Sequence, residues 1–187
     1  MDEKDKKVLL SIVRESIESA IKDTPNEQTQ IEITSPELKE KSGAFVTLRI
    51  HGKLRGCIGR MTSDIPLHKL VSEMAVSAAT EDPRFTQIQP SELEGLEIGI
   101  SVLSPLQKAD DPLDIEIGRH GIYIKKDSST GCFLPQVATE TGWTKEEFLS
   151  QCCSMKAGLS PDAWKNKNVD VYIFTSETIS EKTNKNS

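Results

Sequence analysis

Residues 43–60 read GAFVTLRIHGKLRGCIGR, and this stretch predicts a β-hairpin. Every second residue from Ala44 to Ile50 is apolar, which is the period of a strand with one buried face. Residues 51–53 contain a glycine between polar residues, which is typical of a turn. A second strand is then expected over residues 54–58. The hairpin is the feature from which the rest of the fold is worked out.

Two registers of this hairpin are possible, and the pattern favours a three-residue turn. In that register Thr47 lies opposite Cys57 and Arg49 lies opposite Arg55, while the apolar residues share the other face. A two-residue turn would satisfy burial less well. Two arginines that face each other need negative charge between them, from an anionic ligand or from acidic side chains elsewhere in the chain.

The centre of the second strand carries the candidate chemistry. Gly56 and Gly59 flank Cys57, and their lack of side chains lets a ligand or another backbone approach closely. The neighbouring positive charges would enlarge the thiolate fraction of Cys57, which is the nucleophilic form. We therefore predict that Cys57 is a nucleophile. The alternative is a small packed cysteine beside solvated arginines. The expected ligand-binding residues on the hairpin are Thr47, Arg49, Arg55, Gly56 and Gly59.

A loop after the central helix offers a further cation. Arg84 stands in the sequence Asp82-Pro83-Arg84-Phe85, where proline excludes a continuing helix. We predict that Arg84 is a second anion clamp. A salt bridge with Asp82 or Glu81 is the alternative interpretation.

Two later segments supply the remaining candidate residues. His120 lies in a turn bounded by glycines and is predicted as a base for a thiol, with Arg119 beside it as a ligand-binding residue. The alternative is an exposed turn histidine. Gln136 follows a proline and is predicted to orient an amide or carbonyl of a ligand, although it would equally satisfy backbone groups.

Outside the hairpin, the pattern predicts interleaved helices and strands without the regular spacing of βαβ units. This indicates an α+β fold with mainly antiparallel sheet flanked by helices. Asp64 is expected to cap the second helix, and a capping box at Thr144 and Glu147 begins the third, which Gly158 ends. The predicted helices are 5–22, the segment after Asp64 and the segment after Thr144, and the further strands are 96–103, 113–117, 122–125, 132–134 and 169–173.

The composition of the chain excludes several classes of function. The chain has 187 residues and a net charge of −6, which argues against a nucleic-acid coat. That charge hides a basic island, because residues 41–63 contain five Lys or Arg and no Asp or Glu. Apolar runs are too short to span a bilayer, and the N-terminus lacks an apolar signal core, so a cytoplasmic protein is expected. The four cysteines and three histidines show no zinc spacing, and neither a metal nor a cofactor is predicted.

Several separated motifs together resemble the AMMECR1 domain family. They are Gly43-Ala44-Phe45-Val46-Thr47-Leu48, Leu54-Arg55-Gly56-Cys57-Ile58-Gly59, Asp82-Pro83-Arg84-Phe85, Gly118-Arg119-His120-Gly121, Leu134-Pro135-Gln136-Val137-Ala138, Lys156-Ala157-Gly158-Leu159 and Asp162-Ala163-Trp164. The resemblance implies a two-part α+β architecture, with larger and smaller lobes and the Cys57 motif near a cleft between them. On this basis residues 1–180 form one domain of two packed lobes, and residues 181–187 a disordered polar tail.

The resemblance also implies partners. Prokaryotic members of the family tend to be encoded beside, or fused to, a Memo-like protein and a radical S-adenosylmethionine protein, as in the AmmeMemoRadiSam system. We therefore expect a protein that holds a small anionic or modified ligand in the cleft, with Cys57 as nucleophile and His120 or a water moving protons. The alternative is a non-enzymatic interaction module that docks those partners through the same motif.

Overall fold

The computed structural model describes residues 1–24 and 33–181 and has an α+β fold with two antiparallel sheets. The described chain forms two compact units. The first contains Met1–Leu103 and the residues from Glu177 onward, and the second contains Ser104–Ser176. The second unit is therefore a continuous insertion into the first.

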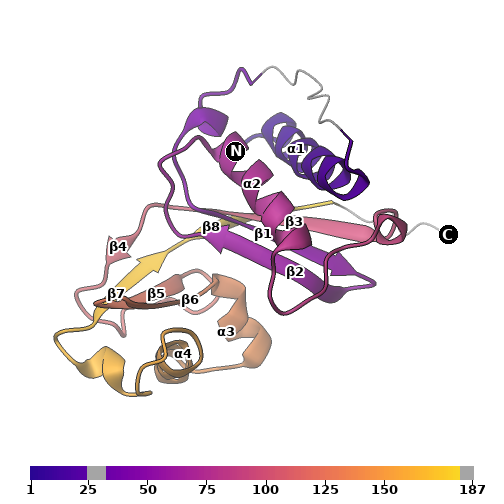
Figure 1. The fold of residues 1–187 in the computed structure, drawn as a ribbon. Coiled ribbons are helices and arrows are strands. Elements are labelled where there is room, and N and C mark those ends of the chain that lie inside the picture. The colour runs from indigo at the N-terminus through magenta and orange to yellow at the C-terminus, as the bar shows by residue number, and fades with distance from the viewer. Residues whose placement is uncertain (25–32, 182–187) are drawn as a thin grey trace. The chain divides into compact units, whose positions relative to one another are not determined.

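A four-stranded sheet with the strand order β2-β1-β3-β8 is the base of the first unit, and two helices cover one of its faces (Figure 1). The core lies between the helices and the sheet, where Val46, Leu48 and Ile100 are fully buried. The elements are α1 (Glu3–Lys22), η1 (Glu37–Lys39), β1 (Ala44–Ile50), β2 (Lys53–Arg60), α2 (Leu67–Thr80), η2 (Pro90–Glu92), β3 (Leu96–Leu103) and β8 (Ser176–Ser180).

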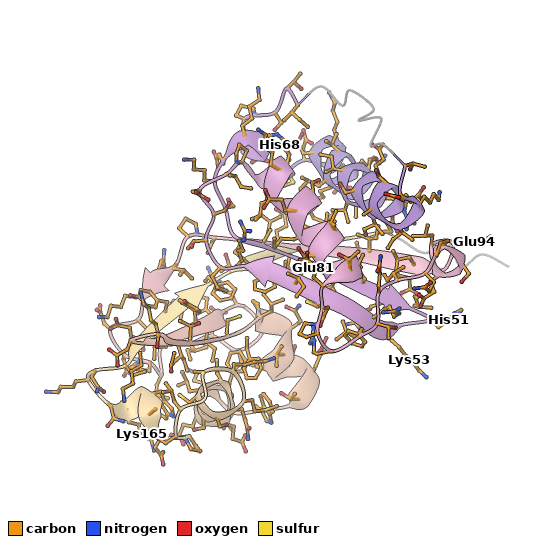
Figure 2. All side chains as sticks on the ribbon, viewed as in Figure 1. His51, Lys53, His68, Glu81, Glu94 and Lys165 are labelled. Atoms are coloured by element: carbon orange, nitrogen blue, oxygen red, sulfur yellow. The ribbon has the colours of Figure 1, made fainter. Side chains whose placement is uncertain are left out.

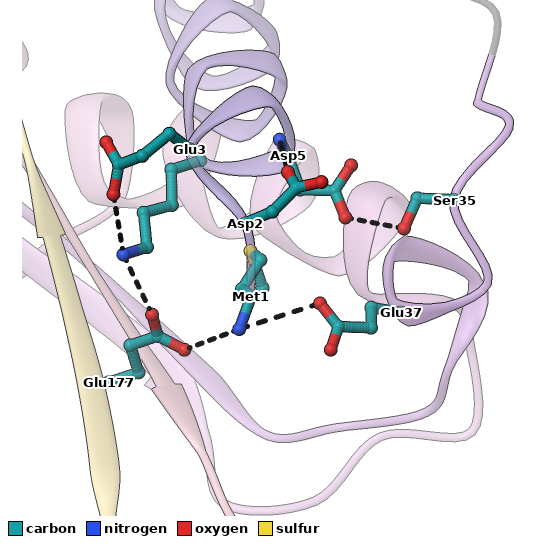
Figure 3. Close-up of polar contacts among 8 residues, drawn as sticks. Met1, Asp2, Glu3, Asp5, Ser35, Glu37 and Glu177 are labelled. Atoms are coloured by element: carbon teal, nitrogen blue, oxygen red, sulfur yellow. Dashed lines mark hydrogen bonds and ion pairs between the residues drawn. The ribbon is translucent and has the colours of Figure 1, made fainter.

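Helix α1 confirms the predicted apolar stripe, because Leu9, Val13 and Ile17 are fully buried. It begins two residues earlier than expected, since the carboxylate of Asp2 accepts a hydrogen bond from the backbone N–H of Asp5 at 2.7 Å. Its first turn is tied to β8 through Glu177, whose carboxylate lies 3.1 Å from Lys6 Nζ and 3.4 Å from the Met1 amine (Figure 3). The N-terminal turn of α1 is thereby fixed to the sheet.

The start of α2 corrects one prediction. Pro66 occupies the N-cap, and no side chain caps the helix, so the cap predicted at Asp64 is wrong. The first helical N–H, that of Leu67, instead donates to the carbonyl of Glu40 at 2.8 Å. A backbone group from the preceding loop thus satisfies the helix end that a side chain was expected to satisfy.

The hairpin combines both registers considered from the sequence. Thr47 lies opposite Cys57 as predicted, but the turn has two residues, and Arg49 lies opposite Leu54. His51 (φ 51°) and Gly52 (φ 73°) form this turn, at the tip where Figure 2 labels His51 and Lys53. A β-bulge at Arg55 absorbs the extra residue and restores the predicted register beyond it. The predicted pair of opposed arginines is therefore absent from this ladder.

The second unit has its own sheet, in the order β4-β7-β5-β6, and its own core (Figure 1). Phe148, Cys152 and Cys153 are fully buried there, which confirms that the two adjacent cysteines are core residues. The capping box at Thr144 is also confirmed. The elements are β4 (Gln107–Lys108), β5 (Gly121–Lys126), β6 (Ser129–Phe133), α3 (Pro135–Thr141), α4 (Lys145–Gln151), the π-helical turn η3 (Cys152–Lys156), η4 (Ala163–Lys165) and β7 (Asp170–Phe174).

The strand predicted over residues 113–117 is wrong. Ile115 is buried as its apolar character suggests, but the segment contains turn residues at 113 and 117 and no regular structure between them. The carboxylate of Asp111 accepts the N–H of Leu113 at 2.8 Å, and its carbonyl accepts the N–H of Asp114 at 3.0 Å. These local bonds use the donors that a sheet partner would need. Helix α3 and the strands β4 and β8 were not predicted.

The end of the described chain is bonded to the first unit. The Glu181 N–H donates to the carbonyl of Ile98 at 3.1 Å, and its carboxylate pairs with Arg14. The remainder of the predicted tail, residues 182–187, lies outside the described residues. Within the part of the chain that the structure describes, no helix has both the length and the apolar character needed to cross a bilayer.

Candidate functional site

Cys57 occupies an edge strand, and its main-chain groups are bonded away from the sheet. Its N–H donates to Asp82 Oδ2 at 2.8 Å, and its carbonyl accepts from Arg84 Nη2 at 3.0 Å. Because these groups point outward, Cys57 and Thr47 form a non-hydrogen-bonded pair of the ladder, in which side chains lie closest. The Sγ atom of Cys57 accordingly lies 3.3 Å from Thr47 Oγ1.

Asp82 and Arg84 form one rigid clamp on this strand. Arg84 donates from Nε and Nη2 to the two carboxylate oxygens of Asp82, at 2.9 and 2.7 Å. The pKa of Asp82 is lowered to about 2, chiefly by the Arg84 guanidinium and also by the Cys57 N–H, although burial opposes this shift. Asp82 is only 4% exposed, so its charge depends on these donors.

Arg84 also lies beside the thiol. The pKa of Arg84 is raised, mainly by Asp82, with smaller contributions from the side chain of Cys57. The Arg84 side chain is 49% exposed and its guanidinium lies 5.5 Å from the centroid of the Phe85 ring. Nε and Nη2 of Arg84 bind the Asp82 carboxylate and the Cys57 carbonyl, and Nη1 makes neither of these bonds, so Nη1 is the nitrogen left for a ligand.

Arg55 is engaged within the protein. It donates to both carboxylate oxygens of Glu92, at 2.8 and 3.0 Å, and to the carbonyls of Thr86 and Gln87, at 2.6 and 3.2 Å. The pKa of Glu92 is lowered chiefly by this guanidinium. Of the two sources of negative charge predicted for the arginines, acidic side chains from elsewhere are the one observed. Arg55 thus holds the loop that follows α2.

The two glycines of the motif are explained by internal packing. A Cβ at Gly56 would lie 2.2 Å from the carbonyl oxygen of Ala78 in α2, and one at Gly59 would lie 2.3 Å from the ring of Phe45. The close approach that the sequence predicted is therefore made by another backbone and by an aromatic ring. The space beside each glycine is filled by protein atoms and is not available to a ligand.

The remaining predicted site residues have separate surroundings. Arg49 is exposed and donates to the carbonyl of Gly52 at 3.1 Å. Arg119 and His120 lie together in the second unit, before β5, and Gln136 lies in the first turn of α3. The structure thus brings Thr47 and Arg84 into contact with Cys57, whereas Arg119, His120 and Gln136 belong to the second unit.

His120 is oriented by its own turn. Its Nδ1 accepts the backbone N–H of Glu116 at 3.1 Å, so a neutral ring carries its proton on Nε2. Neither nitrogen of that tautomer is a free acceptor. The geometry therefore does not support the predicted role of His120 as a general base, and it makes Nε2 a hydrogen-bond donor.

Two of the other three thiols differ from Cys57 in exposure. Burial raises the pKa of both Cys152 and Cys153, whereas Cys57 and Cys132 are partly exposed. Within residues 1–24 and 33–181, no group of three or more His, Cys, Asp and Glu residues is arranged to hold a metal ion.

Sequence reasoning assigned no role to Glu92, and it gave Asp82 only the alternative role of a salt-bridge partner of Arg84, which the structure shows. Nothing in the sequence linked Asp82 to the backbone of Cys57. Glu92 lies 37 positions from Arg55, so only the fold reveals the pair. Charged residues are rarely buried unless they are paired. The burial of Asp82, which only the structure shows, therefore marks it as a residue with bonded partners.

Comparisons with known proteins agree with this fold. A family model described as AMMECR1 matches residues 10–179. A protein from Thermococcus onnurineus is 40% identical over 183 residues, covering 92% of this chain and 88% of that relative, and one from Methanopyrus kandleri is 45% identical over 153 residues, covering 77% and 73%. The crystal structure of an uncharacterized protein from Pyrococcus horikoshii is similar, with a TM-score of 0.90 and 37% identity, and the match covers 97% of this chain and 94% of that one.

Proposed function

Because the chain belongs to the AMMECR1 family, we propose that it handles a small anionic or modified ligand on which the Cys57 thiol acts. A Memo-like protein and a radical S-adenosylmethionine protein are the proposed partners, and the family resemblance supports them. The observation that carries the proposal is the rigid mounting of a partly exposed thiol beside a guanidinium.

The geometry around the sulfur supports a reactive thiol. The clamp formed by Asp82 and Arg84 fixes both main-chain groups of Cys57, so the sulfur is held in place before any ligand arrives. Thr47 Oγ1, at 3.3 Å, is a hydrogen-bonding neighbour for the sulfur. When the sulfur bonds to an electrophilic carbonyl carbon of the ligand, the π electron pair of that C=O bond moves to its oxygen, and the thiol proton passes to that oxygen through water. Arg84 stabilises the negative charge involved.

The ligand contacts follow from the unused donors. Nη1 of Arg84 is the unused donor beside the sulfur, and the hydroxyl of Thr47, which hydrogen-bonds the sulfur, lies next to it. The donors of Arg55, in contrast, are bonded to Glu92 and to two carbonyls. A charged N–H donor of this kind suits one oxygen of a carboxylate or phosphate group. The anion site proposed here is therefore built on Arg84, and Arg55 supports the loop.

Two alkylating reagents of similar size, one anionic and one neutral, test this proposal. Iodoacetate is an anion and iodoacetamide is neutral, and peptide mapping by mass spectrometry gives the labelling rate of each cysteine. We expect Cys57 to react at least tenfold faster than Cys152 and Cys153 with either reagent, because burial protects those two. We also expect the ratio of iodoacetate to iodoacetamide rates at Cys57 to fall severalfold in Arg84→Gln.

The matched control is Arg49→Gln, which removes an exposed arginine from the neighbouring strand. It should leave the ratio of rates at Cys57 unchanged. A ratio that is the same in wild type and Arg84→Gln would contradict an anion site at Arg84. Resistance of Cys57 to both reagents in the folded protein would contradict a nucleophilic role.

A second function is favoured by the internal pairing of the charges. Arg55, and two of the three nitrogens of Arg84, already serve Glu92, Asp82 and backbone carbonyls, which suits a surface kept rigid for docking the same two partners. Cys57→Ser separates the two functions. A docking surface retains its affinity for a Memo-like partner in a binding assay, whereas a thiol mechanism loses turnover by orders of magnitude.

A further inference from the structure

The second unit contains a pocket of about 200 Å³ that the proposed function does not use. Arg119, His120 and Gln107 contribute polar groups to its lining, and Ile173 and Phe174 contribute an apolar wall. The pocket is smaller than the roughly 300–1,000 Å³ of sites that enclose drug-sized ligands. Its volume suits one small molecule or one terminal group of a larger one.

The turn that builds this pocket explains its own glycines. Gly118 has a φ of +83°, which glycine adopts without strain. A Cβ at Gly121 would lie 2.4 Å from the ring of Phe174, so that position is closed to any side chain. The glycines therefore serve the backbone of the turn and its packing. The two side chains between them, those of Arg119 and His120, are the part of the motif that packing leaves unexplained.

The polar groups of these two side chains are donors. His120 presents Nε2–H because its Nδ1 is occupied by the N–H of Glu116, and Nε2 has no protein partner among residues 1–24 and 33–181. Arg119 donates from Nη1 to Glu116 Oε2 at 3.0 Å, and its side chain is 65% exposed, so the rest of its guanidinium remains open. Both residues line the pocket, and hydrogen-bond donors and a positive charge among the lining residues favour an anionic ligand.

Two other lining residues, Ser104 and Thr175, are held together by hydrogen bonds. The Ser104 N–H donates to the carbonyl of Thr175 at 2.9 Å, and the Thr175 N–H donates to Ser104 Oγ at 2.9 Å. Ser104 and Thr175 both line the pocket, so these bonds fix two of its backbone segments to each other. A ligand therefore meets a site whose shape is set before binding.

We propose that this pocket binds a small oxyanion, a carboxylate or phosphate group, which Arg119 and the Nε2–H of His120 hold while its body lies against Ile173 and Phe174. The site lies wholly within the second unit and does not depend on Cys57. Its failure and that of the proposed thiol chemistry are therefore separate results.

The test is a titration at pH 8 followed by NMR of the histidine rings, with inorganic phosphate, propionate and the neutral propionamide as probes. We expect the ring signals of His120 to shift saturably with phosphate or propionate and not with propionamide. Whichever of the two anions binds with the higher affinity shows whether the site prefers phosphate or carboxylate. His51 and His68 lie in the first unit and serve as internal controls within the same spectrum.

Two variants give opposite expectations. Arg119→Gln should weaken binding about tenfold, a loss of about 1.4 kcal/mol, because it removes the only full charge that attracts the anion from this turn. Glu116→Gln should tighten binding, since it frees the guanidinium of Arg119 and keeps the backbone N–H that orients His120. Both side chains are exposed, at 65% and 60%, so both variants should fold.

Three results would overturn the proposal. The first is the absence of any saturable shift of His120 with either anion. The second is an equal shift with propionamide, which would show that charge is not recognised. The third is unchanged affinity in Arg119→Gln, which would place the anion elsewhere.

Discussion

At the scale of single residues, one carboxylate organises the Cys57 site. Asp82 accepts hydrogen bonds from the backbone of Cys57 and from the backbone and side chain of Arg84. It is buried and charged, and its ordinary pKa of 3.8 is lowered to about 2. Its ionisation is therefore linked to folding, because the folded protein binds this proton less readily than the unfolded chain.

Asp82→Asn tests this linkage. A depressed pKa contributes stability that is fully present above pH 4–5 and is lost as the pH falls through about 2. The shift corresponds to about 2 kcal/mol of unfolding free energy. Urea unfolding of wild type and variant should differ by about this amount at pH 6, and the difference should shrink between pH 4 and pH 2.

Glu181→Gln is the comparison, since it removes a carboxylate that pairs with Arg14 far along the chain from Asp82. That pair is about 29% exposed on each side, so its loss should cost under about 1 kcal/mol. A difference between wild type and Asp82→Asn that is the same at pH 2 and pH 6 would show that Asp82 is not linked to folding in this way.

At the scale of elements, the contact between α2 and β2 depends on the absence of one side chain. A Cβ on Gly56 would overlap the carbonyl oxygen of Ala78, which is helix backbone and cannot rotate away. Gly56→Ala should therefore separate α2 from β2 and cost about 1–3 kcal/mol or more in urea unfolding. Altered amide chemical shifts should concentrate in these two elements.

Gly99→Ala in β3 is the matched control. A Cβ there would meet its nearest neighbours at 3.8–4.0 Å, which is ordinary van der Waals contact. We expect a change within about 0.5 kcal/mol. If the two substitutions destabilise the protein equally, the cost belongs to glycine in strands generally, and the contact with α2 is not its cause.

The sequence predicted those elements whose position is determined by the local alternation of apolar and polar residues. The strand Leu96–Leu103 and the pairing of Thr47 with Cys57 followed from alternation and are confirmed. The bulge at Arg55 did not, because alternation was read as one register along the whole hairpin, whereas the structure combines a two-residue turn with the other register beyond one extra residue. The segment 113–117 has the alternation of a strand, but Asp111 diverts its backbone donors.

The site was predictable to a similar extent. The sequence identified Cys57 through its flanking glycines and Arg84 through its loop, and the structure brings them together. It also indicated acidic side chains as one source of negative charge for the arginines, but it assigned no partner to Arg55. Partners such as Glu92 come from distant positions, so their identification required the tertiary structure.

At the scale of the whole molecule, the second unit is inserted between two neighbouring strands of the first. The chain leaves after β3 and returns to β8, which is the neighbour of β3 in the sheet. Ser104 and Thr175, at the two ends of the insertion, are joined by two hydrogen bonds. The two ends of the insertion are thus held together by bonds between its own first and near-last residues.

Excision tests this organisation. A chain in which a short glycine and serine linker replaces residues 104–176 should retain a cooperatively folded first unit, because the linker joins adjacent strands and the core around Val46 and Leu70 is intact. Thermal unfolding followed by circular dichroism checks this. Loss of a cooperative transition would show that the first unit needs the second in order to fold.

The clamp on β2 also bears on how the protein avoids polymerising. The outer side of an edge strand is a template for another chain, and natural sheets protect it with charges, prolines or covering loops. The Asp82-Pro83-Arg84 loop combines these devices, and it occupies the N–H and C=O of Cys57 that an incoming strand would need. Protonation of Asp82 in strong acid, or its replacement, would expose those groups. The residues that hold the thiol in place would then also be the ones that keep the protein from forming fibrils.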